Sequence, residues 1–134
     1  MVINTCFGGF GLSHKGVMRY AEIAGIKLYP WNDHITRKYH GDNPCGYTHY
    51  ALVPIESLER NQNGDPIVSD ENYWYYGNLR RTDTILVQVV EELGPDSWSE
   101  HAELKVVEVP DEVQWHITDY DGVETIHEIH RSWS

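Results

Sequence analysis

The chain has 134 residues, 40% of them apolar, which fits one domain with a core of its own. Its formal net charge of −11 argues against a nucleic-acid polymer as partner, because such partners need basic surfaces. We find no apolar run near the ~20 residues that span a bilayer and no signal-peptide pattern, and Cys6 and Cys45 form no CxxC pair. We therefore expect a cytoplasmic protein, away from membranes, with reduced thiols.

The first predicted elements are a strand, a glycine-rich loop and a helix. Residues 2–5 are β-prone, and Ser13 is a suitable N-cap for a helix that runs to Ala24. Gly25 then serves as the C-cap. A second short strand is predicted at 26–29, where Pro30 ends it.

The middle of the chain, residues 31–79, is rich in turn residues and is expected to vary. It begins with an irregular polar stretch at 31–46, followed by a strand at 47–53. A loop at 61–70 is predicted to be the most dispensable part of the chain. An aromatic cluster at 73–76 follows, and Gly77-Asn78 ends it.

The last third predicts one helix and a β-hairpin. Asp83 is an N-cap for a helix through Leu93, because its apolar residues recur on one face and Gly94-Pro95 ends it. Strands follow from 103 to 109 and around 113–117, and Asp121-Gly122 is a hairpin turn before a final strand at 123–133. The whole pattern predicts a single α+β domain, residues 1–134, with about two helices on a mostly antiparallel sheet.

Charge is unevenly distributed. Residues 83–128 hold thirteen of the 21 acidic residues, and Lys105 is their only base. This half is interpreted as a solvated face that favours solubility, or else as a surface that binds a host protein.

The stretch CFGGFGLS, at 6–13, is the first candidate binding site. Free amides at a helix start, with the positive end of the helix, form a natural phosphate site. The pattern matches neither the dinucleotide fingerprint nor the Walker motif, so a close-packed turn is the alternative. The candidate ligand-binding residues here are Phe7, Gly8, Gly9, Phe10, Gly11, Ser13 and His14.

Three further groups extend this candidate site. Adjacent arginines at a predicted helix start suit a phosphate, although they could instead pair with the protein's own carboxylates. The 73–76 cluster offers rings for a nucleobase, and the basic aromatic C-terminus either binds ligand or packs on its own sheet. The residues assigned from these groups are Arg80, Arg81, Tyr75, Tyr76, His130, Arg131 and Trp133.

The eight histidines give no strong catalytic or metal signature. His127 and His130 have i, i+3 spacing rather than the i, i+4 of a zinc helix. A second set could collect a metal from loops and comprises Asp33, His34, His40 and His49. We assign no catalytic residue, no metal and no cofactor.

Three segments carry a resemblance to known sequences: VINTCFGGFGLS at 2–13, RRTDTILVQVVEELG at 80–94 and ELKVVEVPDEVQWHITDYDGVETIHEIHRSW at 103–133. They resemble a family of small, mostly uncharacterised proteins of tailed phages and prophages. Thr84 departs from the helix-starting Pro of that family, which bears on the cap rather than on a site.

The resemblance implies a phage product in the bacterial cytoplasm, where small accessory proteins often counter host defences. The expected function is a homo-oligomeric sponge that sequesters a small nucleotide immune signal without cleaving it. One alternative is a nucleotide-processing phosphodiesterase or hydrolase with His14, His127 or His130 as acid or base. Another is an acidic inhibitor of a host protein, and a virion component is a third.

Overall fold

The computed structural model describes residues 1–5, 9–108, 115–120 and 122–128, and it is a small α+β domain. The described helices are α1 (His14–Ala24), α2 (His34–His40) and α3 (Thr84–Leu93). The described strands are β1 (Val2–Asn4), β2 (Tyr29–Trp31), β3 (His49–Ala51), β4 (Tyr73–Trp74), β5 (Leu104–Val106), β6 (Trp115–Tyr120) and β7 (Val123–Glu128).

The caps predicted from the sequence set the ends of α1 and α3. Ser13 accepts a hydrogen bond from the amide of Gly16, and Gly25 adopts the left-handed conformation at the end of α1, with φ of 73°. Asp83 accepts bonds from two amides at the start of α3. Gly94, with φ of 57°, ends α3.

The described strands form three separate antiparallel groups rather than one sheet. They are the pair β1–β5, the three-stranded sheet β2–β3–β4 and the hairpin β6–β7. In the hairpin Tyr120 pairs with Val123, as the predicted turn requires.

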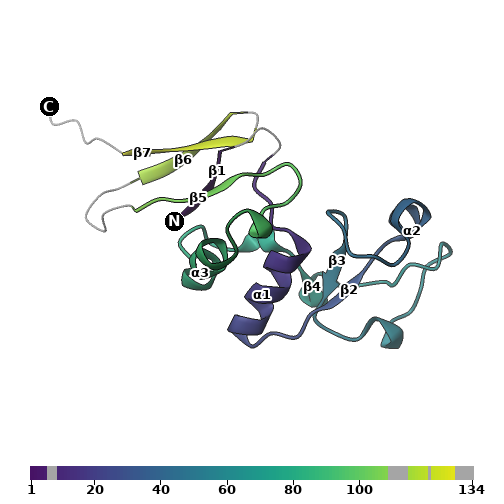
Figure 1. Ribbon diagram of the computed structural model, residues 1–134. Coiled ribbons are helices and arrows are strands. Elements are labelled where there is room, and N and C mark those ends of the chain that lie inside the picture. Colours follow the sequence, from purple (N-terminus) through teal and green to yellow (C-terminus); the bar gives the residue numbers. More distant parts are fainter. Residues whose placement is uncertain (6–8, 109–114, 121, 129–134) are drawn as a thin grey trace, which may run out of the picture.

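The hydrophobic core lies between α1, α3 and the β1–β5 pair (Figure 1). Val17 of α1, Leu86 and Val89 of α3, and Val2 of β1 are almost completely buried. The sheet β2–β3–β4 and helix α2 lie at the other end of the molecule from the hairpin (Figure 1). This separation leaves α2 outside the main core, whereas Tyr50 of β3 belongs to it.

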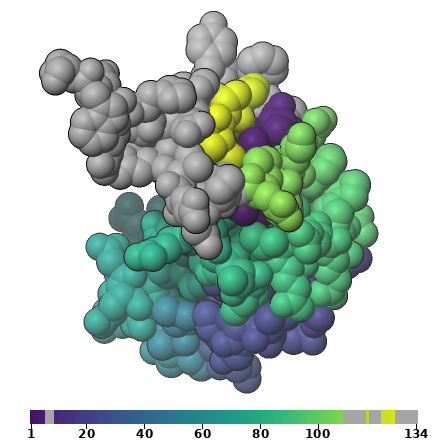
Figure 2. Space-filling model, turned by 90° about the vertical axis from the view of Figure 1, so that its left-hand side faces the viewer, coloured from purple at the N-terminus to yellow at the C-terminus, as the bar shows by residue number. Residues whose placement is uncertain are grey.

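A buried ion pair attaches the hairpin to the domain. Glu124 of β7 is 5% exposed, and its carboxylate accepts hydrogen bonds from the amide of Asn4 and from the guanidinium of Arg81. Figure 2 shows β7 in yellow beside β1 in purple and β5 in green. The contact therefore joins three segments that are far apart in the sequence.

Three sequence predictions differ from the structure. Residues 34–40, expected to be irregular, form α2, because Asp33 caps it by accepting a bond from the amide of Thr36 at 2.8 Å. Strand β2 covers Tyr29–Trp31 rather than the predicted 26–29, and it includes Pro30 because β2 is an edge strand and one side of its backbone needs no partner. Asp65, in the loop expected to be dispensable, is 6% exposed and contacts α2.

None of the described helices is long and apolar enough to cross a bilayer.

Candidate functional site

A cavity of about 510 Å³ lies between α2, strands β3 and β4, and the segments that flank them. Its wall is mostly aromatic, with six tyrosines, two histidines and one tryptophan among the lining residues. The lining residues are Asp33, Ile35, Thr36, Tyr39, His40, Gly46, Tyr47, Thr48, His49, Tyr50, Tyr73, Trp74, Tyr75 and Tyr76. This size and lining are typical of sites for small organic ligands.

The antiparallel register of β3 and β4 builds the floor of the cavity. Tyr50 of β3 pairs with Trp74 of β4, and their rings meet edge to face with centroids 6.2 Å apart. Trp74 also contacts Tyr20 of α1. Because Tyr50 is 6% exposed and belongs to the core, the floor is continuous with the packed interior.

The rim of the cavity carries apolar and aromatic side chains that face solvent. Ile35 and Tyr39 of α2 are 59% and 72% exposed, and Tyr47 is 65% exposed. Exposed large apolar side chains gathered at one cavity are typical of a binding surface.

A hydrogen-bonded chain of carboxylate, imidazole and phenol crosses the cavity wall. Asp33 Oδ2 lies 3.3 Å from His49 Nε2, and His49 Nδ1 lies 2.6 Å from the Tyr73 hydroxyl. Hydrogen bonds from Thr36, its amide foremost, and from His49 hold the pKa of Asp33 down at about 2, so this carboxylate is ionised at neutral pH. With Asp33 as acceptor for a proton on Nε2, His49 Nδ1 is the acceptor for the Tyr73 hydroxyl.

Burial shifts the pKa values of some polar groups in the wall or directly behind it. It raises the pKa of the Tyr50 hydroxyl well above its usual range, and burial, followed by the neighbouring Tyr75 ring, raises the pKa of the Tyr76 hydroxyl. The Tyr50 hydroxyl lies 2.8 Å from His14 Nδ1, and burial lowers the pKa of His14. The Tyr50 and Tyr76 phenols are therefore neutral at pH 7, and Asp33 is the ionised carboxylate of the wall.

Several residues predicted from the sequence gather at this cavity or directly behind it. Tyr75 and Tyr76 line it, and their ring centroids are 4.8 Å apart. Phe10 packs against Tyr76 at 6.0 Å, and His14 contacts Tyr50 from behind. The glycine-rich stretch and the aromatic cluster, distant in sequence, are therefore neighbours.

The glycine-rich loop approaches its neighbours closely. A Cβ atom built on Gly11 would lie 2.2 Å from Ser99 Oγ, 2.8 Å from Ser99 Cβ and 3.3 Å from the Tyr76 hydroxyl. Gly9 has a φ of 92°, which favours glycine, and open space around its Cβ position. Ser13 has intramolecular partners, since its amide donates to Ser97 O and its hydroxyl donates to Asp96 O.

The two adjacent arginines differ in their surroundings. Arg81 pairs with Glu124, and its guanidinium stacks on the Phe10 ring with the central carbon 3.8 Å from the centroid. Arg80 is exposed, and its side chain has no partner among the described residues. Neither lines the cavity, and Arg80 is the one whose donors are open to a ligand.

Some candidate residues lie outside the described part of the chain. These are Phe7, Gly8, His130, Arg131 and Trp133. The ligand-binding roles assigned to these five residues therefore stay predictions.

The histidine set proposed for a metal is divided in the structure. His40 and His49 line the cavity with Asp33, whereas His34 contacts Asp65, with Nδ1 2.5 Å from Oδ2. Within residues 1–5, 9–108, 115–120 and 122–128, no three histidine, cysteine or acidic side chains are grouped so that they could hold a metal.

Sequence reasoning missed that the tyrosines at 39, 47 and 50 belong to one site with the 73–76 cluster. Each is separated from Tyr75 and Tyr76 by loops, so only the pairing of β3 with β4 and the position of α2 bring them together. The available signal was compositional, since nine tyrosines against two phenylalanines is unusual and eight of the nine lie between residues 20 and 76.

Comparisons of the chain with protein-family models, with curated proteins and with solved structures found no match.

Proposed function

We propose that this protein captures a small nucleotide-type ligand by enclosing its planar base in the tyrosine cavity. The observation that carries the proposal is the cavity itself, about 510 Å³ in volume, with many aromatic rings and a hydrogen-bonding pair, Tyr73 and His49, in its wall. Stacking of a base on an aromatic side chain stabilises nucleic-acid complexes by ~1–3 kcal/mol per base.

The polar groups of the wall would also favour a ligand with a heterocyclic ring over a ligand with a purely apolar ring. When Tyr73 donates to His49, its oxygen lone pairs face the ligand as acceptors. A base with an amino or ring N–H group would satisfy them, whereas a hydrocarbon ring would leave them unpaired. Arg80 and the amides near Gly9 remain the candidates for contact with a phosphate.

The biological setting follows from the phage resemblance and from the absence of a strong catalytic signature. We place the protein in the bacterial cytoplasm, as a phage-encoded sponge that withholds an immune signal from its host receptor. A homo-oligomer would close the exposed rim of Ile35, Tyr39 and Tyr47 over the ligand, which reduces the cost of capture.

A second candidate function is hydrolysis of the same ligand. The chain from Asp33 through His49 to Tyr73 favours it, because an ionised carboxylate that orients an imidazole is a common arrangement for general acid–base catalysis. The two functions differ in whether the ligand leaves the cavity intact.

The test is thermal unfolding against cyclic dinucleotides, cyclic trinucleotides, ADP-ribose derivatives and plain nucleotides, followed by mass spectrometry of the recovered ligand. A ligand at a hundredfold excess over its Kd adds ~2.7 kcal/mol, which raises the Tm by roughly 10 °C for a chain of this size. Intact ligand supports sequestration, and altered ligand supports hydrolysis. No shift with any compound contradicts both and returns the search to a protein partner for the acidic face.

Tyr75 provides the matched variants. It is 46% exposed, so Tyr75→Ala removes a cavity ring with little effect on the fold, and Tyr75→Phe keeps the ring without its hydroxyl. We expect Tyr75→Ala to weaken binding at least about tenfold and Tyr75→Phe to stay close to the parent. Ile67→Ala, an exposed apolar position outside the cavity, is the control.

A further inference from the structure

A second cavity, of about 260 Å³, lies on the other side of α2 from the tyrosine cavity. Arg37 of α2, Arg60 of the following loop and Trp31 of β2 line it. The Trp31 ring stacks on His49, with centroids 4.5 Å apart, and His49 lines the tyrosine cavity. This ring pair therefore stands between the two cavities.

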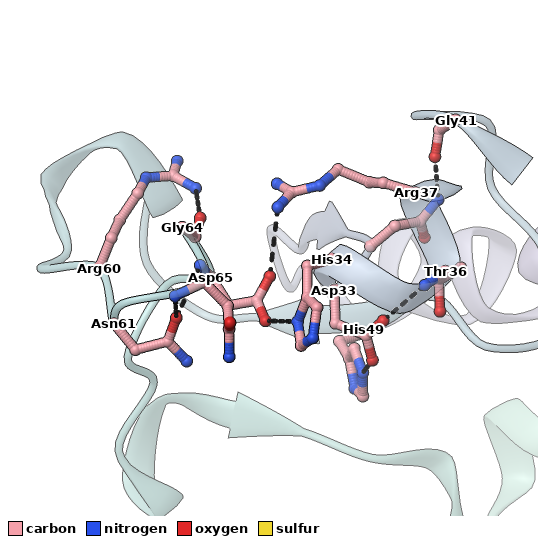
Figure 3. Close-up of polar contacts among 12 residues, drawn as sticks. Asp33, His34, Thr36, Arg37, Gly41, His49, Arg60, Asn61, Gly64 and Asp65 are labelled. Atoms are coloured by element: carbon pink, nitrogen blue, oxygen red, sulfur yellow. Dashed lines mark hydrogen bonds and ion pairs between the residues drawn. The ribbon is translucent and has the colours of Figure 1, made fainter. Parts of the chain in front are cut away.

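The two guanidiniums of the second cavity converge on Gly64. Arg60 Nη1 donates to the Gly64 carbonyl at 2.9 Å, and Arg37 Nη2 lies 3.8 Å from the position of a Cβ atom on Gly64. Figure 3 shows both groups extending toward the same backbone turn, one from α2 and one from the loop. Asp65 compensates the charge of Arg37, whereas Arg60 has no ion pair among the described residues.

The surrounding loop fixes this arrangement. Asp65, 6% exposed, accepts from Arg37 Nη2 at 3.3 Å and contacts His34 (Figure 3). The Asn61 side chain accepts from the amides of Asn63 and Asp65, which closes the turn. The cavity is thus preformed, and each of the two guanidiniums makes a single hydrogen bond among the described residues, which leaves most of its N–H donors open.

We propose that this second cavity binds a small oxyanion, such as a phosphate group, between Arg37 and Arg60. Arginine presents parallel N–H donors that match the oxygens of phosphate, and two such forks from different elements can enclose one anion. Asp42 also lines the cavity but forms no ion pair with either arginine in the described part of the chain. Its charge opposes the anion and limits the affinity to about the millimolar range.

The experiment is a nitrogen-15 NMR titration with sodium phosphate and, separately, with ribose 5-phosphate, each at constant ionic strength against sodium chloride. The Trp31 indole N–H is a reporter, because it is closed off from solvent and has no hydrogen-bond partner in the described structure. We expect saturable shifts of this signal and of the Arg37 and Arg60 side-chain N–H signals. Tighter binding of ribose 5-phosphate would identify a sugar phosphate as the source of the group, and tighter binding of phosphate would identify the free ion.

Variants that change single charges test whether the arginine pair binds the phosphate group. Arg60→Gln keeps the fold, because Arg60 is exposed and bonds only a carbonyl, and it should weaken binding at least about tenfold. Asp42→Asn should tighten binding about threefold. Lys38→Gln removes the same charge from α2 outside the cavity and should change little.

Two results would overturn the inference. One is the absence of a saturable shift with either phosphate compound, and the other is an equal loss of affinity in Arg60→Gln and Lys38→Gln. The outcome is independent of the proposed function, because these probes carry no base and the variants leave the tyrosine cavity unchanged.

Discussion

Substitution of Gly11 by alanine tests how the glycine-rich loop is packed. The added Cβ would lie 2.2 Å from Ser99 Oγ and 2.8 Å from Ser99 Cβ. The hydroxyl can rotate away, but Ser99 Cβ cannot, because the Ser99 amide donates to the Gly11 carbonyl at 3.0 Å and holds the two backbones together. Overpacking of this kind costs about 1–3 kcal/mol, so we expect a Tm lower by roughly 3–10 °C.

Two further variants test whether the contact with Ser99 causes the loss of stability. Gly46→Ala adds the same methyl group where no atom lies within 4 Å, and its effect should stay within about 0.5 kcal/mol. Ser99→Gly removes both clashing atoms, so the double variant with Gly11→Ala should recover part of the loss beyond additivity. Equal Tm values for the Gly11 and Gly46 variants in thermal unfolding would refute the close approach.

Three other predictions concern the cavity and the hairpin. Gly77→Ala places a Cβ 2.2 Å from the Tyr75 ring, so the ring must move. Ligand affinity, measured by calorimetry, should therefore fall by at least about tenfold, whereas the control Tyr75→Phe should bind normally. Asp33 has a pKa of about 2 in the folded chain, against an ordinary value of 3.8. The ionised carboxylate therefore stabilises the folded chain fully above pH ~4, and this contribution is lost as the pH falls through about 2. Asp33→Asn keeps an N-cap, so in denaturant titrations its stability should fall less with acid than that of the parent protein. Identical dependence of stability on pH in the two proteins would contradict the lowered pKa of Asp33. Arg81→Met leaves the buried Glu124 carboxylate without its cation and should cost about 3 kcal/mol, whereas the double variant with Glu124→Met should be closer to the parent protein in urea unfolding.

The last of these predictions changes how the adjacent arginines can be tested. A variant that removes both would lose stability through Arg81, so reduced binding could not be assigned to a lost phosphate contact. Arg80→Gln alone separates the two effects, because Arg80 is exposed and has no described side-chain partner. Its Tm should stay unchanged while affinity for a nucleotide falls.

Local signals in the sequence were sufficient for α1 and α3. Both helices have a side-chain N-cap, an apolar face and a glycine at the end, and these features act within a few residues. Helix α2 also has an N-cap, Asp33, and a terminal glycine, Gly41, but its seven residues include no apolar face that a periodicity search could detect. Its contact with Asp65, a residue 28 positions after Arg37, could not be inferred from local patterns.

The candidate site was predictable only in part for the same reason. The run at 73–76 identified Tyr75 and Tyr76 as ring donors, because adjacent aromatics are visible in the sequence. The link from Asp33 to His49 and Tyr73 depends on the pairing of β3 with β4 and on the position of α2. Sequence spacing contains none of this information.

The cavity takes its rigidity from the core rather than from its own segment. Tyr50 and Trp74 form its floor, and through Trp74 and Tyr20 they are packed on α1. Helix α1 is in turn fixed by capped ends and by the contact of Gly16 with Ser97. A ligand that enters therefore meets rings already held in place, and binding spends little free energy on ordering them. A segment rich in turns can for this reason present a preformed site. Overpacking at Gly11, which also approaches the Tyr76 hydroxyl, should therefore weaken binding as well as stability.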